Sequence, residues 1–455
     1  MRDWLPTLIP RRQGTHHRNR TLAASPPQVL ALGFLGLIVV GAVLLSLPQA
    51  AVQRLSFFEA LFMATSAVTV SGLAVVDPAS ELTHFGQITL ALLVQIGGMG
   101  FVTFAVIAAI TMRKRISVNQ QALALEAFNQ TSVSRIRDTA LQVFKIAALI
   151  ELSAALILFL RWLIDMPWTT ALYRALFHSV TAFNNAGFSL FHDSLVPVSG
   201  DLIVVMTLSG LIILGGIGFT VLADVGQKWR WRNLQAYTKL ILIGTLVLNL
   251  IGFAALWLLE MNNPNTLGML GRADQALAAW MQSAATRTAG FTTMDLHYLR
   301  DSTQLVLILL MLIGGGSLST ASGIKIGTLI VLLAAVRSYV RQRQEVVLMD
   351  RTVAPETVQK ALALFLITGA LYFASVLLMT LFEDLPLISI LFEAASALST
   401  TGMSHGITDK LSTPSQLLLM ILMFTGRLGP LTLVYTLATR KRSRIRYPEG
   451  NFQVG

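Results

Sequence analysis

The sequence predicts an all-α membrane protein in which four tandem repeats surround one axis. Of the 455 residues, 54% are hydrophobic and only 13% are charged, about half the charge of a typical soluble protein. Several uncharged stretches reach the length of about 20 residues that a helix needs to cross a bilayer. A segment that ends in glycine also recurs four times at nearly constant spacing, which indicates an internal repeat.

Eight stretches are long and apolar enough to be transmembrane helices. They run from 29 to 47, 86 to 112, 143 to 164, 202 to 223, 240 to 259, 302 to 336, 361 to 382 and 411 to 439. Lys and Arg follow every second stretch and also fill the N-terminal tail. Because positively charged loops stay in the cytoplasm, we expect both termini there. The opposite loops are rich in Asp and Glu, which raises the local cation concentration outside.

The composition also excludes several classes of protein. A net charge of +11 does not indicate a nucleic-acid partner here, because the basic residues flank apolar stretches. Cysteine is absent, so disulfides and thiolate metal sites are excluded. Neither an HExxH motif nor a serine, histidine and acid arrangement is evident. We therefore expect no enzyme and no covalent cofactor.

Four shorter apolar segments lie between the two spans of each pair. They read FEALFMATSAVTVSGL (58 to 73), YRALFHSVTAFNNAGF (173 to 188), ALAAWMQSAATRTAGF (276 to 291) and ISILFEAASALSTTGM (388 to 403). Each has a bulky aromatic residue ten positions before a glycine and small or hydroxyl residues between them. The glycines are Gly72, Gly187, Gly290 and Gly402.

These segments are too short to cross the membrane. A helix of about 13 residues reaches only about 20 Å, so the chain must return as non-helical backbone. Such backbone is tolerated at membrane depth where it is buried in protein or lines an aqueous cavity. Four loops around one axis, beside the negative carboxyl ends of four short helices, would form a ring of carbonyls that binds a cation. The residues flanking the glycines in this predicted filter are Val70, Ser71, Asn185, Ala186, Thr288, Ala289, Thr400 and Thr401.

The sixth span contains GGGSLSTASGIKIG from 314 to 327. Each glycine costs about 1 kcal/mol relative to alanine in a helix, so the span is expected to break there. A flexible polar loop beneath a cation filter could occupy or vacate the permeation path. The alternative interpretation is close helix packing on small residues.

Two basic residues are predicted to lie within the membrane, and a third lies beside a filter. Arg427 is expected to face the cytoplasmic half of a pore and to bond to loop carbonyls or repel cations, since a buried cation usually faces a cavity. The alternatives are an ion pair with Glu151 or snorkelling toward the cytoplasm. The depth of Lys325 depends on where the sixth span breaks. Arg287 is expected to point away from the axis, toward acidic groups on neighbouring loops. The segment LGGIGF (214 to 219) is interpreted as helix packing.

The four glycine segments and the glycine-rich sixth span resemble the superfamily of Trk, Ktr and HKT potassium transporters. Within it, the chain is most similar to the KtrB-type potassium-translocating subunits of bacteria, because the two additional N-terminal spans of TrkH proteins are missing. The resemblance implies four helix, pore helix, helix repeats in a pseudo-fourfold arrangement around one pore, with one filter glycine per repeat. Glycine rather than serine at Gly72 implies potassium selectivity. The gate implied by the resemblance comprises Gly314, Gly315, Gly316, Ser317, Ser319, Thr320, Ser322, Gly323 and Lys325, with Arg427 opposite.

The resemblance also implies a setting and partners. It implies a bacterial inner (plasma) membrane, uptake stimulated by sodium, a homodimer, and a cytosolic RCK-type ring (KtrA-like) through which ATP or ADP would act. A single glycine per loop suggests looser selectivity than in potassium channels, so rubidium and some sodium could pass. A sodium or mixed cation carrier is the alternative within this class. A non-conducting membrane receptor or scaffold is the alternative of another class.

The expected domain organisation follows the repeats. It comprises a cytoplasmic tail (1–27), repeat 1 (28–115), a linker helix (116–138), repeat 2 (139–232), repeat 3 with the intramembrane loop (233–343), repeat 4 (344–440) and a C-terminal tail (441–455). Basic helices at 113 to 138 and 337 to 360 are expected to lie on anionic lipid headgroups or to dock an acidic ring partner.

Overall fold

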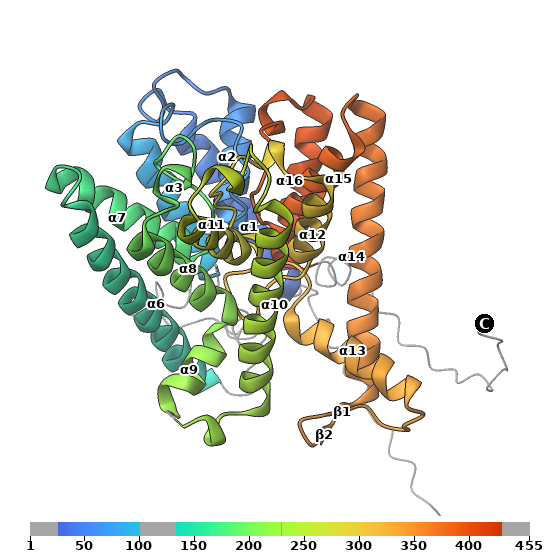
Figure 1. Ribbon diagram of the computed structural model, residues 1–455. Helices are drawn as coiled ribbons and strands as arrows, with labels where there is room; N and C mark the ends of the chain where they lie inside the picture. The colour runs from blue at the N-terminus through green and yellow to red at the C-terminus, as the bar shows by residue number, and fades with distance from the viewer. Residues whose placement is uncertain (1–25, 101–132, 229, 430–455) are drawn as a thin grey trace, which may run out of the picture.

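The computed structural model describes residues 26–100, 133–228 and 230–429, and it is mostly helical there (Figure 1). The helices are α1 (Pro26–Leu45), α2 (Phe57–Thr69), α3 (His84–Gly98), α6 (Val133–Trp162), α7 (Trp168–Phe183), α8 (Leu202–Ile217), α9 (Phe219–Gln227), α10 (Ala236–Glu260), α11 (Arg272–Thr286), α12 (Asp301–Leu312), α13 (Ile326–Val340), α14 (Pro355–Phe382), α15 (Leu387–Ser399) and α16 (Thr413–Leu428). Short 3₁₀ turns lie at Val196–Val198, Trp231–Asn233, Leu267–Met269, Leu296–Tyr298 and Thr408–Lys410. A two-stranded hairpin pairs β1 (Val347–Leu348) with β2 (Arg351–Thr352).

The helices follow one another in a recurring order. A first helix (α1, α6, α10 or α14) packs on a short helix (α2, α7, α11 or α15), and another helix (α3, α8, α12 or α16) comes next along the chain. Each of α3, α8 and α12 contacts the short helix of the following unit, and α16 contacts α2. These contacts connect the four units in a closed cycle. In the view of Figure 1, α6 and α14 lie on opposite sides, and α9 and the hairpin lie at the same end.

Within the described ranges, three helical segments are long and apolar enough to cross a membrane by themselves: Leu141–Trp162, α10 and α14. The pair α8 and α9 would be a fourth if it is counted as one bent span. Several further apolar helices, among them α12 and α13, are shorter. The predicted spans 86–112 and 411–439 extend beyond the described residues, so the number of eight remains a prediction.

The predicted span 202–223 is not one helix. Helix α8 ends at Ile217 and α9 leaves at 99° to it. Gly218 between them has a φ of +100°, which only glycine adopts readily. A Cβ at this position would lie 2.5 Å from the Ser317 carbonyl oxygen, so the break is fixed by close packing against another part of the chain. The expectation of a continuous span was therefore wrong.

The predicted break in the span 302–336 is confirmed. Helix α12 ends at Leu312 and α13 begins at Ile326. Between them, Gly314 N donates to Ile324 O at 2.9 Å, and Ile324 N donates to Leu312 O at 3.0 Å. The intervening residues therefore form a loop that is closed at its base; residues 313–325 are called the crossing loop below.

The predicted basic helix at 337–360 is also wrong. Helix α13 ends at Val340, and the hairpin follows, with Met349 and Asp350 at positive φ in its turn. Two such residues match the twist of the paired strands. Helix α14 begins at Pro355, because proline is favoured in the first helical turn. Most of the predicted linker helix 116–138 lies outside the described residues.

Local capping positions the short helix α2. Ser56 Oγ accepts from Glu59 N at 3.2 Å, and the Glu59 carboxylate accepts from Ser56 N at 2.8 Å, which forms a capping box. The chain therefore enters α2 in a fixed direction, so that its carboxyl end points to the centre of the cycle of units.

Burial separates an inner from an outer layer. Almost every residue in the second half of each short helix is buried, and most are Ala, Ser or Thr. In contrast, the long helices expose large apolar side chains such as Leu152, Leu246 and Leu377. Small residues inside and exposed leucines outside are typical of a helical bundle in lipid.

Glu260 joins the end of α10 to the start of α12. Its fully buried carboxylate accepts hydrogen bonds from Thr303 Oγ1 (2.5 Å), Asn263 Nδ2 (2.6 Å), Thr266 Oγ1 (2.7 Å) and Arg300 N (3.0 Å). One side chain therefore satisfies four donors, three from the two loops that flank α10 and α12 and one from α12 itself.

We predict that Glu260→Ala lowers the free energy of unfolding by about 3 kcal/mol, because it leaves these buried donors without their acceptor. The measurement is thermal unfolding of the purified protein in detergent. The control is Glu356→Ala in the exposed first turn of α14, which should cost less than about 1 kcal/mol. Equal melting temperatures for the two variants would contradict the prediction.

Candidate functional site

The four predicted glycines meet at the centre of the molecule. All four have positive φ: +91° at Gly72, +68° at Gly187, +74° at Gly290 and +89° at Gly402. The Cβ that each lacks would strike the carbonyl oxygen of the residue just before the next glycine. The pairs are Gly72 with Ala186, Gly187 with Ala289, Gly290 with Thr401 and Gly402 with Ser71. Each glycine therefore packs on the next one, and the fourth closes the ring on the first.

The same backbone shape precedes each glycine. The residue two positions earlier also has positive φ: +58° at Val70, +59° at Asn185, +76° at Thr288 and +51° at Thr400. None of these is glycine, and the β-branched residues Val70, Thr288 and Thr400 adopt this conformation only where the surroundings enforce it. Strain at three of four equivalent positions indicates a functional site.

Hydrogen bonds orient the peptide groups at the ring. Ser71 N donates to Ser66 O at 2.8 Å, and Gly72 N donates to Ser66 Oγ at 3.0 Å. In the fourth unit, Gly402 N donates to Ser396 Oγ at 3.0 Å. The carbonyl of a trans peptide points opposite to its N–H. Because these N–H groups point back to the short helices, the preceding carbonyls point away from those helices.

A cavity of about 630 Å³ opens over the ring and is lined by all four glycines. Its other lining residues include Asp77, Glu81, Asp409 and His192. Three carboxyl groups at the mouth of a concave site raise the local concentration of cations.

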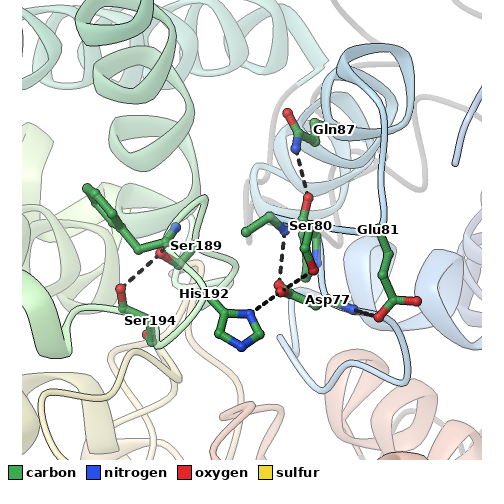
Figure 2. Close-up of polar contacts among 10 residues, drawn as sticks. Asp77, Ser80, Glu81, Gln87, Ser189, His192 and Ser194 are labelled. Atoms are coloured by element: carbon green, nitrogen blue, oxygen red, sulfur yellow. Dashed lines mark hydrogen bonds and ion pairs between the residues drawn. The ribbon is translucent and has the colours of Figure 1, made fainter. Parts of the chain in front are cut away.

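His192 joins the outer loops of the first two units (Figure 2). Its Nδ1 lies 2.6 Å from Asp77 Oδ2, and the same carboxylate accepts from Ser80 Oγ at 2.7 Å and from Ala79 N at 3.0 Å. The Asp77 carboxylate raises the pKa of His192. The ion pair of His192 with Asp77 therefore persists at pH values somewhat above the usual pKa of histidine, and it is lost as the pH rises further.

The crossing loop passes beneath the ring and is bound to the break between α8 and α9. Three backbone hydrogen bonds make this junction: Gly316 N to Gly216 O (2.8 Å), Thr320 N to Gly215 O (3.2 Å) and Phe219 N to Leu318 O (3.0 Å). Thr320 is buried, and its hydroxyl donates to Phe183 O, at the end of the short helix α7, at 3.2 Å. The loop therefore lies directly under the second side of the ring.

Arg427 joins the crossing loop to the first unit. One guanidinium nitrogen donates to the Thr320 carbonyl, and the other donates to Gly97 O (2.5 Å) and Gly98 O (2.8 Å). The expected bonding to loop carbonyls is confirmed.

The alternative ion pair of Arg427 with Glu151 is wrong. The Glu151 carboxylate instead accepts from Gln95 Nε2 at 3.0 Å and from Asn184 Nδ2 at 3.2 Å. These amides come from α3 and from the end of α7, so Glu151 has a structural role between three helices.

A second cavity, of about 560 Å³, lies on the other side of the crossing loop. Its lining includes Ser319, Ala321, Lys325 and Arg427. Lys325 is partly buried and donates to Ala321 O at 2.6 Å. The loop therefore separates the glycine ring from this cavity, and two cationic side chains line it: Lys325 from the loop and Arg427 from α16.

The expectation of an acidic partner for Arg287 was wrong. Its Nε donates to Asn249 Oδ1 on α10 at 3.0 Å, and the side chain is only 5% exposed. Arg287 directly follows α11, at the carboxyl end where the helix dipole favours a cation, and its buried Nη1 has no hydrogen-bond partner among the described residues.

Sequence reasoning missed two features of the site. The glycines of LGGIGF were interpreted as helix packing, and Gly215 does lie against the end of α7, where an added Cβ would strike Phe183 O. The interpretation did not foresee that Gly215 and Gly216 accept hydrogen bonds from the crossing loop or that Gly218 breaks the helix. Both this segment and the crossing loop contain consecutive glycines, and this shared pattern was the available signal that the two pack closely on each other. The pair of Asp77 and His192 had no signal, since 115 residues separate the two.

Comparison with known proteins agrees with this geometry. The model of the TrkH family, described as "Cation transport protein", matches residues 15–444. The chain is 43% identical to "Ktr system potassium uptake protein B" of Bacillus subtilis (strain 168), over 95% of this chain and 97% of the relative. It is also 43% identical to the protein of that name from Vibrio alginolyticus, over 94% and 95%.

More distant relatives extend the picture. "Potassium/sodium uptake protein NtpJ" of Enterococcus hirae is 33% identical over 95% of this chain and 97% of its own length. The crystal structure of the potassium transporter TrkH from Vibrio parahaemolyticus has the same fold, with a TM-score of 0.70 at 19% identity, covering 94% of this chain and 87% of TrkH. These relatives are named as transport proteins rather than enzymes. This chain therefore belongs to the TrkH family of cation transport proteins.

Proposed function

We propose that this protein takes up potassium across the bacterial inner membrane through a channel-like pore on the axis of the four glycines. The observation that carries the proposal is the closed ring, in which each glycine at positive φ packs on the carbonyl before the next one. The names of the Bacillus and Vibrio relatives support potassium as the transported ion.

The ring has the chemistry of a potassium filter. Carbonyl oxygens replace the hydration shell of the ion, and the negative carboxyl ends of α2, α7, α11 and α15 stabilise its charge. Four helix, pore helix, helix repeats in pseudo-fourfold arrangement would provide one side each. The filter would consist of Gly72, Gly187, Gly290 and Gly402, flanked by Val70, Ser71, Asn185, Ala186, Thr288, Ala289, Thr400 and Thr401. A single layer of glycine carbonyls would select less strictly than the longer filter of a potassium channel.

The crossing loop would be the gate. It lies between the ring and the second cavity, and Arg427 holds it to the first unit. Positive charge on Lys325 and Arg427 would add an electrostatic barrier to a cation below the ring. The residues of this gate are Gly314, Gly315, Gly316, Ser317, Ser319, Thr320, Ser322, Gly323, Lys325 and Arg427.

The eight-span topology with both termini in the cytoplasm belongs to the same proposal, and the alternation of basic loops supports it. The homodimer, stimulation by sodium, and control by a cytosolic RCK-type ring through which ATP or ADP acts are also parts of this proposal. The support for these three is the resemblance to Ktr systems, together with the term "Ktr system" in the names of the relatives.

A second candidate is a sodium or mixed cation carrier. The name of the Enterococcus relative, which includes both ions, favours it. A single experiment separates both candidates from a non-conducting receptor or scaffold.

The test is growth at low potassium of a bacterium that lacks its own uptake systems, with this protein expressed alone or with a KtrA-like ring. We expect rescue of growth that sodium increases, and net uptake of potassium well above that of sodium. Sodium uptake that equals potassium uptake would favour the mixed carrier. Normal membrane expression without any cation uptake, with or without the ring, would refute conduction.

We predict that Gly290→Ser lowers the ratio of potassium to sodium uptake by about tenfold, because overpacking the ring costs a few kcal/mol. The new Cβ would strike the Thr401 carbonyl and lie 3.2 Å from Gly402 Cα. The measurement is uptake of both ions at equal expression. Gly369→Ser on α14 is the control, since no atom lies within 4 Å of its added Cβ. Unchanged ion selectivity in the Gly290→Ser variant would refute the assignment of this ring as the selectivity filter.

We predict that Arg427→Gln raises potassium flux about threefold to tenfold, because it removes charged hydrogen bonds that hold the crossing loop closed. Removal of residues 318–320 should act in the same direction. The measurement is the initial rate of uptake without the ring partner, and Arg337→Gln, exposed on α13, is the control. A lower flux in both variants, with normal assembly, would show that the loop supports conduction instead of blocking it.

A further inference from the structure

Three of the four short helices carry a buried polar side chain that hydrogen-bonds to the chain just beyond the filter glycine. The side chains are His178 on α7, Gln282 on α11 and Glu393 on α15, and all are fully buried. They stand nine residues before Gly187 and Gly402 and eight before Gly290. The residues that directly follow each glycine (73–76, 188–191, 291–294 and 403–406) are called the return segments below.

In the fourth unit, Glu393 binds its return segment through hydroxyl groups. Ser404 Oγ donates to one carboxylate oxygen, and Thr408 Oγ1 donates to the other at 3.3 Å. Ser404 Oγ also accepts from Gly406 N at 2.9 Å. The carboxylate therefore fixes a turn that begins two residues after Gly402.

In the second unit, the imidazole of His178 binds the return segment in the same way. Its Nδ1 lies 2.8 Å from Arg174 O, and since a carbonyl only accepts, Nδ1 carries the hydrogen. Nε2 is then the acceptor for Leu190 N at 3.3 Å, and it lies 3.1 Å from Ser189 Oγ. The return segment is again held two and three residues after the glycine.

In the third unit, Gln282 binds Thr293. Its Oε1 accepts from Thr293 N at 2.9 Å and lies 3.2 Å from Thr293 Oγ1. Its Nε2 lies 3.4 Å from the sulfur of Met403, directly after the fourth filter glycine. One amide therefore contacts the return segments of two neighbouring units.

The first unit is different. The equivalent position is Met63, which is buried and whose side chain has no N–H or O–H group. The outer loop of this unit is held from the side instead, as Figure 2 shows: Asp77 pairs with His192 of the second unit, and Gln87 Nε2 donates to Pro78 O at 2.8 Å.

We propose that His178, Gln282 and Glu393 are positioning residues that hold the return segments and thereby set the ion selectivity of the filter. This inference rests on the proposed function, because it concerns the same ring. A filter of this kind would distinguish potassium from sodium by the distance between its carbonyl oxygens. If the backbone were held on only one side of the glycine, it could move inward and bind a smaller ion as well. Each side chain bonds on the outer side of the glycine, while the short helix holds the inner side. Buried in a low dielectric, these hydrogen bonds are strong and costly to break.

The test compares Glu393→Met with Glu393→Gln. The first gives the fourth unit the methionine of the first unit, and the second retains an oxygen acceptor for Ser404. We expect Glu393→Met to raise the ratio of sodium to potassium uptake about fivefold, and Glu393→Gln to stay within about twofold of the wild type. Met63→Leu is the matched control, a volume-conserving change at the equivalent position that should leave the ratio unchanged.

The readouts separate this inference from the proposed function and from misfolding. If the wild type conducts potassium selectively but an assembled Glu393→Met variant keeps the wild-type ratio, the inference is refuted and the proposed function stands. If Glu393→Met does not assemble, Ser404→Ala is the deciding variant. It removes the hydroxyl that donates to Glu393 and leaves the buried carboxylate its hydrogen bond from Thr408. An unchanged ratio in Ser404→Ala, or equal loss of selectivity in the Gln and Met variants, would also refute the inference.

Discussion

The structure depends on one constraint: the backbone that ends each short helix must expose its carbonyls deep inside a protein built for lipid. A buried carbonyl without a partner is costly, and here the N–H groups on the same peptides already donate to the short helices. Under the proposed function, the carbonyl oxygens of the four units would share one partner, a desolvated cation. The small buried residues of the short helices and the positive φ of Gly72 and its counterparts follow from bringing four chains this close. The outer helices shield this arrangement from lipid.

The same constraint explains why the region below the ring is irregular. A non-helical segment at this depth lacks the internal hydrogen bonds of a helix, so its peptide groups need partners elsewhere in the protein. The crossing loop satisfies its peptide groups through Gly215, Gly216 and Phe219 on a neighbouring unit. Those partners are available only because α8 stops at Gly218. The break in one unit and the loop of the next are therefore one structural feature.

Much of this could be predicted from the sequence, because glycine and hydropathy report backbone shape directly. The repeat placed Gly72, Gly187, Gly290 and Gly402 at equivalent positions, and the five glycines of 314–327 predicted a break that the structure has between Leu312 and Ile326. The break at Gly218 could not be predicted, since its φ is set by Ser317, about 100 residues away. Residues 347–352 carry no strong turn signal, so their hairpin was mistaken for helix. Arg287 was assigned to acidic partners because sequence shows charge but not the end of the helix on which it lies.

Formation of the ring from one polypeptide affects how such a protein can evolve. All four sides of the glycine ring come from a single polypeptide, and the chain beyond the glycine is held differently in each unit, by an imidazole in the second, an amide in the third and a carboxylate in the fourth. In an assembly of four identical chains, any mutation is imposed four times at once. Here a mutation alters one quadrant and leaves the other three intact. Under the proposed function, ion preference can therefore change in small steps, through one side of the ring at a time.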